Sequence, residues 1–224
     1  MKSIFVITGT TNGLGKSFLK LLKNDSIIIS INRKEIIYQE NNLHNLSIDL
    51  AVINLEKINN FEILLSKLLT KDIKKVVFIN NAFSMGTLSK IDELNSNEII
   101  NNFNTNIISS FLLIKSFISV TKHLSIQKQI LNISSGAAKK AIDGWSVYCI
   151  GKSSLEMLIA NILVEYSDYS CFNIDPGVMD TKMQLKIRDF KEGKNNQYFV
   201  ELFKNKELID TEEAAKNILK GYTQ

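Results

Sequence analysis

A tyrosine and a lysine four residues apart, Tyr148 and Lys152, are the side chains in this sequence best suited to acid–base chemistry. On a helix this spacing places both side chains on one face. An ammonium at ~4 Å in an effective dielectric of ~20 favours the phenolate by about 4 kcal/mol, equivalent to at most ~3 pK units. We therefore expect Lys152 to lower the pKa of Tyr148, so that the phenol can exchange a proton with a substrate.

Two adjacent serines, Ser134 and Ser135, follow the apolar segment 130–133 upstream of this pair. An apolar run of this kind is typical of a buried strand. Because successive side chains of a strand point to opposite faces, the two hydroxyls are expected to face different surroundings. One of them is therefore a candidate partner for Tyr148, and alternation alone leaves open which one.

The chain opens with a short β-branched segment, 3–8, that leads into the glycine-rich segment 9–15. The apolar residues Phe18, Leu19 and Leu22 then recur with helical spacing. A strand, a glycine turn and a helix together aim the amide groups of the helix N-terminus at a phosphate. The glycines are spaced G-x-x-x-G-x-G, unlike the G-x-G-x-x-G of other dinucleotide folds. We interpret this segment as a phosphate-binding loop; the alternative is a plain turn between strand and helix.

Arg33 follows the second predicted strand, 27–31, at a position where NAD enzymes usually carry a carboxylate for the ribose hydroxyls. No carboxylate is present at that point, and a planar guanidinium is instead suited to a ribose phosphate. The sequence therefore favours NADP over NAD. The alternative, an arginine in a solvated turn, would leave the preference open.

Strand-like and helix-like segments alternate along the chain, which predicts an α/β fold with a doubly wound parallel sheet of about six strands and helices on both faces. A turn at Pro176 and Gly177 follows the last strand, at the sheet edge where such folds bind ligands. Thr211 is a candidate N-cap for the last helix. The expected strands are 3–8, 27–31, 46–50, 75–82, 129–134 and 171–174, and the expected helices are 54–69, 95–120, 145–166 and 211–220.

Size and composition limit the possible classes of protein. The 224 residues suit one domain, and 45% hydrophobic with 22% charged residues is ordinary for a globular protein. No stretch approaches the ~18 apolar residues of a membrane span, so we expect no membrane partner and a cytoplasmic location. The formal charge of +4 is spread along the chain, which gives no argument for nucleic acid. No metal-ligand spacing is present.

Taken together, these motifs resemble those of the short-chain dehydrogenase/reductase family, which implies a Rossmann-like sheet with strand order 3-2-1-4-5-6. The resemblance assigns catalytic roles to Ser135, Tyr148 and Lys152, and it selects Ser135 over Ser134. It also implies that Asn106 links Lys152 to a water in a proton relay. Without the resemblance Asn106 would be read only as a polar residue of a helix.

The resemblance further implies that the loops at one sheet edge bind NADP(H). Phe83 departs from the family pattern, because N-N-A-G has become Asn80-Asn81-Ala82-Phe83, which puts the course of the backbone there in doubt. Asn12 stands where many NADP-dependent members have a second basic residue. The implied cofactor-binding residues are Gly9, Thr11, Asn12, Gly13, Leu14, Gly15, Arg33, Asp49, Leu50, Asn81, Ala82, Tyr148, Lys152, Pro176, Gly177, Val178 and Thr181.

Within the family, segments 144–152 and 176–184 look most similar to sepiapterin reductases and bacterial benzil reductases. This implies an NADPH-dependent carbonyl reductase for a ketone or dicarbonyl, with Trp145, Met179 and Met183 contacting the small-molecule substrate under a lid at about 182–207. The alternatives are a pterin side-chain (sepiapterin) reductase and a non-catalytic NADP-binding regulatory protein. The resemblance also implies a homodimer or homotetramer, and the short C-terminal part predicts six strands where most relatives have seven.

Overall fold

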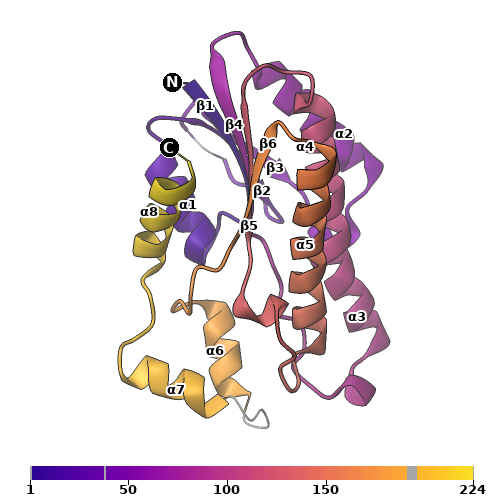
Figure 1. Ribbon diagram of the computed structural model, residues 1–224, viewed down its shortest axis with the longest axis vertical. Coiled ribbons are helices and arrows are strands. Elements are labelled where there is room, and N and C mark those ends of the chain that lie inside the picture. The colour runs from indigo at the N-terminus through magenta and orange to yellow at the C-terminus, as the bar shows by residue number, and fades with distance from the viewer. Residues whose placement is uncertain (1, 38, 191–195, 224) are drawn as a thin grey trace.

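A computed structural model describes residues 2–37, 39–190 and 196–223 of the chain. Its centre is a six-stranded sheet with the order β3-β2-β1-β4-β5-β6, in which every neighbouring pair is parallel (Figure 1). The predicted fold class and strand order are therefore confirmed. The strands are β1 (Lys2–Thr8), β2 (Ile27–Asn32), β3 (Leu43–Ser47), β4 (Ile73–Asn80), β5 (Gln127–Ile133) and β6 (Tyr169–Ile174).

The central strands are apolar on both faces because helices cover both sides of the sheet. β1 lies between β2 and β4, with Val6 paired to Ile29 on one side and to Phe78 on the other. All three side chains are fully buried. Near-continuous β-branched sequence of this kind is what a parallel strand buried on both faces requires. The carboxyl ends of the strands consequently meet at a single edge of the sheet.

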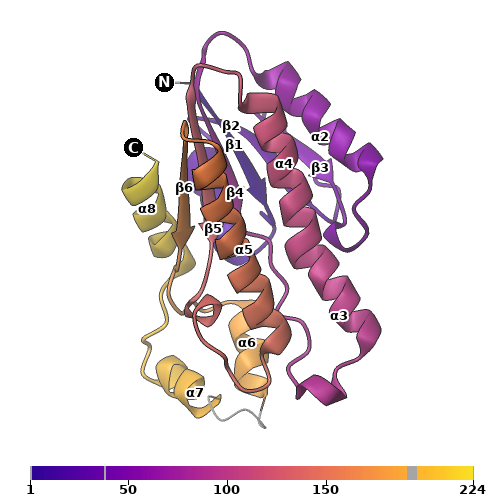
Figure 2. The same ribbon diagram turned by 45° about the vertical axis from the view of Figure 1, so that its right-hand side comes forward.

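One face of the sheet is covered by α2, α4 and α5, and the other by α1 and α8 (Figures 1 and 2). Phe61, Phe117 and Ile159 fill the core beneath the first layer, and Phe18 and Ala215 lie beneath the second. The helices are α1 (Gly13–Leu22), α2 (Leu55–Leu68), α3 (Ser96–Phe103), α4 (Ser109–Thr121), α5 (Ser146–Glu165), α6 (Lys182–Asp189), α7 (Asn196–Lys204) and α8 (Thr211–Tyr222).

The helix expected at 95–120 is continuous but contains a π-helical turn at Asn104–Ile108, between α3 and α4. Its start is capped by Asn95, whose side chain accepts hydrogen bonds from the backbone N–H of Asn97 and Glu98. Isolated π turns of this kind insert an extra residue into a helix and often lie at functional sites. Here the turn contains Asn106, which is completely buried.

Several expected boundaries, such as those of β4, β5 and β6, differ from the structure by one or two residues, and two further errors have a clear local cause. β3 is Leu43–Ser47 and not 46–50, because the chain leaves the sheet at Asp49, whose carboxylate accepts a hydrogen bond from Ala51 N at 3.0 Å and caps a 3₁₀ turn at Leu50–Val52. The N-cap of α8 is Asp210, whose Oδ1 accepts hydrogen bonds from two backbone N–H groups of the first turn. Thr211 is therefore the first helical residue.

Two helical segments, Ser96–Thr121 and Ser146–Glu165, are long and apolar enough to cross a membrane, with mean hydropathies of 1.3 and 1.4. The expectation that no stretch of the chain approaches this limit is therefore wrong. Both segments lie against the sheet, where Phe117 and Ile159 belong to the core. Core helices of soluble proteins commonly pass the same test, so this finding is weak evidence for a membrane span.

Helices α6 and α7 lie below the carboxyl edge of the sheet (Figure 1). They form the described part of the segment expected to be a lid at about 182–207, and residues 191–195 of that segment lie outside the described residues. Ile187 of α6 and Phe199 of α7 pack against the aromatic residues at the start of α5. The segment thereby closes one side of the space at the sheet edge.

Candidate active site

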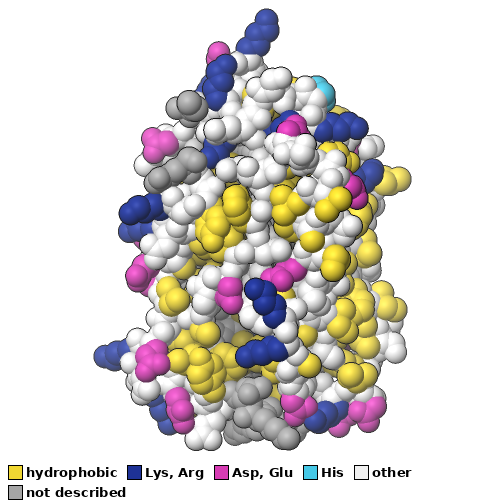
Figure 3. Space-filling view, in the orientation of Figure 1, with side chains coloured by type: hydrophobic (Ala, Val, Ile, Leu, Met, Phe, Trp, Pro, Cys, Tyr) yellow, Lys and Arg dark blue, Asp and Glu magenta, His cyan; other side chains and the backbone are white. Residues whose placement is uncertain are grey.

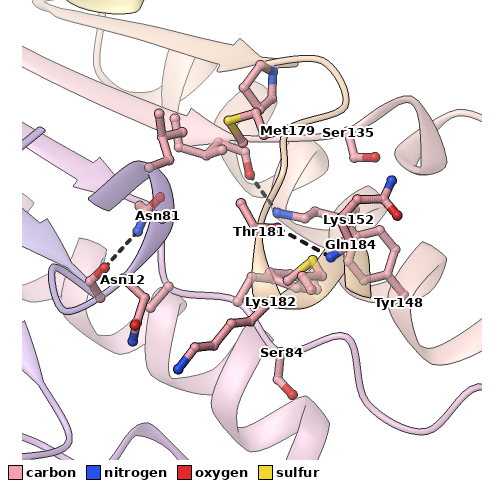
Figure 4. Close-up of a pocket in the computed structure, with 18 of the residues that line it drawn as sticks. Asn12, Asn81, Ser84, Ser135, Tyr148, Lys152, Met179, Thr181, Lys182 and Gln184 are labelled. Carbon is pink, nitrogen blue, oxygen red and sulfur yellow. Dashed lines mark hydrogen bonds between the residues drawn. The ribbon is translucent and has the colours of Figure 1, made fainter. Parts of the chain in front are cut away.

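A cavity of about 1190 Å³ opens at the carboxyl edge of the sheet, between the loops that follow the strands and helices α6 and α7. It brings together side chains from both ends of the chain (Figure 4). Two of the predicted site residues, Gly15 and Asn106, do not line it. The predicted residues that do line it are Gly9, Thr11, Asn12, Gly13, Leu14, Arg33, Asp49, Leu50, Asn81, Ala82, Ser135, Trp145, Tyr148, Lys152, Pro176, Gly177, Val178, Met179, Thr181 and Met183.

The glycine loop after β1 takes a course that side chains would obstruct. Gly9 and Gly13 have φ of +74° and +50°, a region that L-residues with side chains rarely adopt. A methyl group on Gly15 would lie 2.0 Å from the carbonyl oxygen of Gly9, so Gly15 allows α1 to pack tightly on the loop and does not itself face the cavity. The start of α1 therefore presents bare backbone to the cavity, an arrangement that fits a dinucleotide phosphate.

Thr8 and Asn81 fix this loop to the end of β4. The Asn81 side-chain amide donates to the carbonyl oxygens of Thr8 at 2.9 Å and Gly9 at 3.1 Å. In return the Thr8 hydroxyl accepts hydrogen bonds from the backbone N–H of Asn81 at 3.0 Å and Ala82 at 2.9 Å. The structural role of Asn81 is thus to position the loop. Sequence reasoning missed Thr8, whose only signal is a polar residue at the end of an apolar strand.

A second polar group positions the rim that carries Arg33. Asn32 Oδ1 accepts from Thr10 N at 2.8 Å, and Asn32 Nδ2 donates to Ser30 Oγ at 2.6 Å. These three residues are buried, whereas Arg33 is exposed and lines the cavity together with Asp49. Sequence reasoning also missed the buried Asn32. It anchors the strand end that leads directly to Arg33.

Ser134 and Ser135 have different partners, as strand alternation predicted. Ser134 Oγ donates to the carboxylate of Glu156 at 2.6 Å and is buried against α5. Ser135 Oγ accepts from Ala137 N at 3.2 Å, and its hydroxyl lies near enough to Tyr148 to lower the pKa of the phenol. The structure therefore places Ser135, and not Ser134, beside Tyr148.

Tyr148 lies in an aromatic cluster, where its ring meets Phe83 edge-on at 5.2 Å and Trp145 edge-on at 5.8 Å between ring centres. Burial raises the pKa of Tyr148 to about 12, and the nearby Asp175 carboxylate adds to the rise, while the Ser135 hydroxyl opposes it. The prediction that Lys152 lowers this pKa is therefore wrong for this structure, because desolvation of the phenolate dominates. The phenol is protonated across the physiological pH range.

Lys152 is buried, and its ammonium donates a hydrogen bond to the carbonyl oxygen of Ile133 at 2.7 Å. Burial lowers the pKa of Lys152 to about 7, against the opposing effect of the Asp175 and Glu156 carboxylates. Its nitrogen lies 5.8 Å from the centre of the Tyr148 ring. The lysine is thus close to the phenol, and its charge changes near neutral pH.

Phe83, which departs from the family pattern, fills the space beneath this lysine. The Lys152 nitrogen lies 3.9 Å from the centre of the Phe83 ring. The ring reaches this place because the neighbouring helical residue is Gly151, where a methyl group would lie 2.8 Å from Phe83 Cζ. The phenylalanine that stands in place of the family's glycine in this loop therefore finds room because α5 carries a glycine, Gly151, beside it.

Asn106 holds the loop that follows Phe83. Its Oδ1 accepts from Ser84 N at 2.7 Å, and its Nδ2 donates to Ser84 O at 2.8 Å and to Asn102 Oδ1 at 2.8 Å. Both ends of the amide are thus used to fix backbone and side chains behind the cavity. A role for Asn106 in a proton relay stays a prediction.

The part of the cavity beyond Tyr148 contains a cluster of apolar side chains. Trp145 is buried and stacks on Phe199 of α7, with 5.5 Å between ring centres. Ile187 and the predicted substrate contact Met183 pack in the same cluster, and Met179 lines the same cavity. Thr181 Oγ1 accepts a hydrogen bond from Gln184 N at 3.3 Å and caps α6. This region suits a substrate with apolar flanks.

The sequence of the chain matches a known protein family. The family model described as short chain dehydrogenase matches residues 3–192, which include the glycine loop, Ser135, Tyr148 and Lys152. The chain belongs to the short-chain dehydrogenase/reductase family. It is therefore an oxidoreductase by family.

Among curated proteins, this family member is 31% identical to a benzil reductase ((S)-benzoin forming) of Bacillus cereus over 95% of this chain and 91% of the relative. It is 25% identical to the sepiapterin reductase of Rattus norvegicus over 97% of this chain and 90% of the relative. The resemblance to these two groups of reductases is thereby confirmed.

Solved structures share the fold. The KRED1-Pglu enzyme superposes with a TM-score of 0.82 at 22% identity, covering 99% of this chain and 95% of that one. ElxO with NADP bound superposes with a TM-score of 0.76 at 22% identity, covering 99% of this chain and 92% of that one. At this level of identity the likeness establishes the fold alone.

Proposed function

We propose that this family member is an NADPH-dependent carbonyl reductase that converts a ketone or dicarbonyl to an alcohol. The observation that carries the proposal is the grouping of Ser135, Tyr148 and Lys152 at one cavity that also contains the glycine loop. The 31% identity to a benzil reductase supports this substrate class. The regulatory alternative is disfavoured because all three side chains that the chemistry needs are present.

In the proposed reaction, the hydroxyl groups of Ser135 and Tyr148 donate hydrogen bonds to the carbonyl oxygen of the substrate and stabilise the negative charge that develops there. Tyr148 then gives its proton to that oxygen. An alkoxide is a stronger base than a phenolate, so a phenol with a pKa of about 12 is protonated beforehand and still acidic enough to complete the transfer. In its charged form the adjacent Lys152 favours the phenolate that remains, although it does not offset the desolvation that keeps the pKa of Tyr148 high.

The proposed cofactor is NADP(H), which supplies the hydride when bound. The start of α1 and the bare backbone at Gly9 and Gly13 would hold its phosphates, and Arg33 would bind the ribose phosphate. Support comes from the exposed position of Arg33 at the cavity rim. It also comes from ElxO, a protein of the same fold whose structure contains NADP.

A screen of NADPH oxidation tests the proposal directly. The protein is assayed with benzil, sepiapterin, a quinone and an acyl thioester, and each assay is repeated with NADH. We expect the highest kcat/KM with the dicarbonyl and NADPH. A clear preference for sepiapterin would assign the protein to pterin reduction. Binding of NADPH without turnover of any carbonyl would instead support the regulatory alternative.

Tyr148→Phe is the control that links any activity to the site, because it removes the proton and leaves the ring. Turnover is expected to fall by about 10²–10⁴-fold while NADPH still binds, as judged by quenching of its fluorescence. Ser134→Ala is the matched control, because Ser134 is bonded to Glu156 and not to Tyr148. Undiminished turnover in Tyr148→Phe would rule out the assignment.

We further propose that the protein acts in the cytoplasm as a homodimer or homotetramer. Apolar side chains that are 48–64% exposed lie on the outer helical segments: Ile108 in the π turn, Phe111 in α4, and Ile150 and Met157 in α5. Charged side chains of both signs are scattered over the face shown in Figure 3, and apolar ones also gather along its right-hand side. Light scattering on the purified protein, alone and as Phe111→Glu, tests the proposal: a monomer in both would contradict it.

A further inference from the structure

Gln184 is a buried residue whose side-chain amide makes no hydrogen bond within the described part of the chain. The residue is 3% exposed, yet its Oε1 has no hydrogen-bond partner among the described residues. No described residue bonds its Nε2 either, and the backbone N–H is bonded to the Thr181 side chain. A buried, unpaired polar atom is unfavourable, so such a group in a folded protein calls for an explanation.

The sequence offers this glutamine a local partner that it does not take. Thr181-Lys-Met-Gln184 matches the capping box, in which a glutamine at the third helical position accepts from the N–H of the capping residue. Only half of that motif is formed, because Gln184 N donates to Thr181 Oγ1 at 3.3 Å without the reciprocal bond. The amide is therefore turned away from the helix end.

Gln184 lines the cavity, and the close-up draws it with Tyr148, Lys152 and Ser135 on one side, opposite Asn12 and Asn81 (Figure 4). Its Oε1 is fully buried, so Nε2 is the end of the amide that is available to a molecule in the cavity. Residues three apart share a helix face, and Ile187, the neighbour on that face of α6, packs in the cluster that contains Tyr148. The amide is thus on the side of the cavity where the substrate carbonyl would be placed.

From this geometry, and resting on the proposed function, we propose that Gln184 binds a second oxygen of the substrate, on the carbon next to the reacting carbonyl. Ser135 and Tyr148 serve the first oxygen. Through Nε2 the amide can donate to a carbonyl oxygen or to a hydroxyl oxygen at this position. Gln184 therefore selects vicinal dicarbonyls, and their hydroxy-ketone products, over simple ketones with the same apolar flanks.

Such selection follows from general physical chemistry. A site built to hydrogen-bond a polar group discriminates against an analogue that lacks it, because the polar group of the site is then left buried and unpaired. The remaining wall is apolar around Met183, Ile187 and Trp145, so it contributes equally to both kinds of substrate. Beside these apolar side chains, the amide of Gln184 is the group that can distinguish the two kinds of substrate.

The test compares benzil with deoxybenzoin, in which one carbonyl is replaced by methylene and both rings are kept. The full chain and its Gln184→Leu and Gln184→Met variants are assayed with NADPH. We expect kcat/KM for benzil to fall about tenfold more than kcat/KM for deoxybenzoin in both variants. The dissociation constant of NADPH, from fluorescence quenching, serves as the second readout.

Gln129→Leu is the matched control, because Gln129 Oε1 is also buried and unpaired but does not line the cavity. Its ratio of the two kcat/KM values should equal that of the unmodified protein. Equal losses on both ketones in the Gln184 variants would overturn the inference in favour of a structural role. Equal losses together with weaker NADPH binding would overturn it in favour of a cofactor contact. Failure of the unmodified protein to reduce either ketone would refute the proposed function itself, and the inference with it.

Discussion

The ammonium of Lys152 lies over the face of Phe83, 3.9 Å from the centre of the ring. An aromatic face attracts a cation, and the attraction reaches ~2 kcal/mol when the pair is shielded from water. Lys152 is buried here, and desolvation lowers its pKa to about 7. The ring is thus one of the few groups near this lysine that favour its charged form, together with the Ile133 carbonyl and two more distant carboxylates.

Replacing Phe83 with leucine should therefore lower the pKa of Lys152 further, by about one unit, because an apolar group of similar size offers no attraction to the cation. The measurement is the pH profile of kcat for NADPH-dependent reduction, in which the limb near neutral pH should move to lower pH. Phe172→Leu is the control, because that ring packs on Tyr222 away from the cavity. An unmoved limb would mean that the ring acts only by filling space.

Gly151→Ala should destabilise the protein, although alanine is normally the better helix residue. The added methyl group would meet Phe83 Cζ at 2.8 Å, and overpacking of this kind costs about 1–3 kcal/mol. Gly221→Ala in α8 is the matched control, because nothing lies within 4 Å of its added methyl. Denaturant unfolding should show a loss for the first and no loss for the second. Phe83→Leu combined with Gly151→Ala should recover part of the loss.

The stability of the protein should depend on pH through Lys152. Its pKa falls from 10.5 in the unfolded chain to about 7 in the folded one. Between these values the unfolded state binds a proton that the folded state does not, so this group makes stability rise with pH from about 7 to about 10.5. Lys152→Met removes the effect. The melting temperature of Lys152→Met minus that of the unmodified protein should therefore be largest at pH 6 and fall toward pH 10. A difference that does not change with pH would contradict the shifted pKa.

Arg33 should decide the choice of cofactor. Removing its guanidinium in Arg33→Ala takes away the group that would pair with the ribose phosphate of NADPH, and a charge-assisted hydrogen bond is worth about 1.5–3 kcal/mol. The ratio of kcat/KM with NADPH to that with NADH should fall by at least tenfold. Lys34→Ala, one residue further along the same exposed turn, provides the comparison. Equal falls in both variants would indicate a general effect of positive charge.

Much of this molecule could be predicted from the sequence because the signals are local. Buried β-branched segments, the glycine loop and the Tyr148–Lys152 spacing predicted a parallel α/β sheet and indicated the family. The resemblance to that family then implied the strand order and nearly all the residues that meet at the cavity. Errors occurred where short-range alternatives compete, as at Asp210, which caps α8 in place of the neighbouring Thr211. The local sequence does not show which of two adjacent residues is the N-cap when the side chains of both can cap a helix.

The sequence alone determined the family chemistry, because the residue types and their order along the chain specify a phosphate loop followed by a serine, a tyrosine and a lysine. The tertiary structure alone decided the electrostatics, because the pKa of a buried group depends on what surrounds it in space. The enclosure of Tyr148 among Phe83 and Trp145, the ring beneath Lys152 and the unpaired amide of Gln184 all depend on contacts between segments distant in the chain.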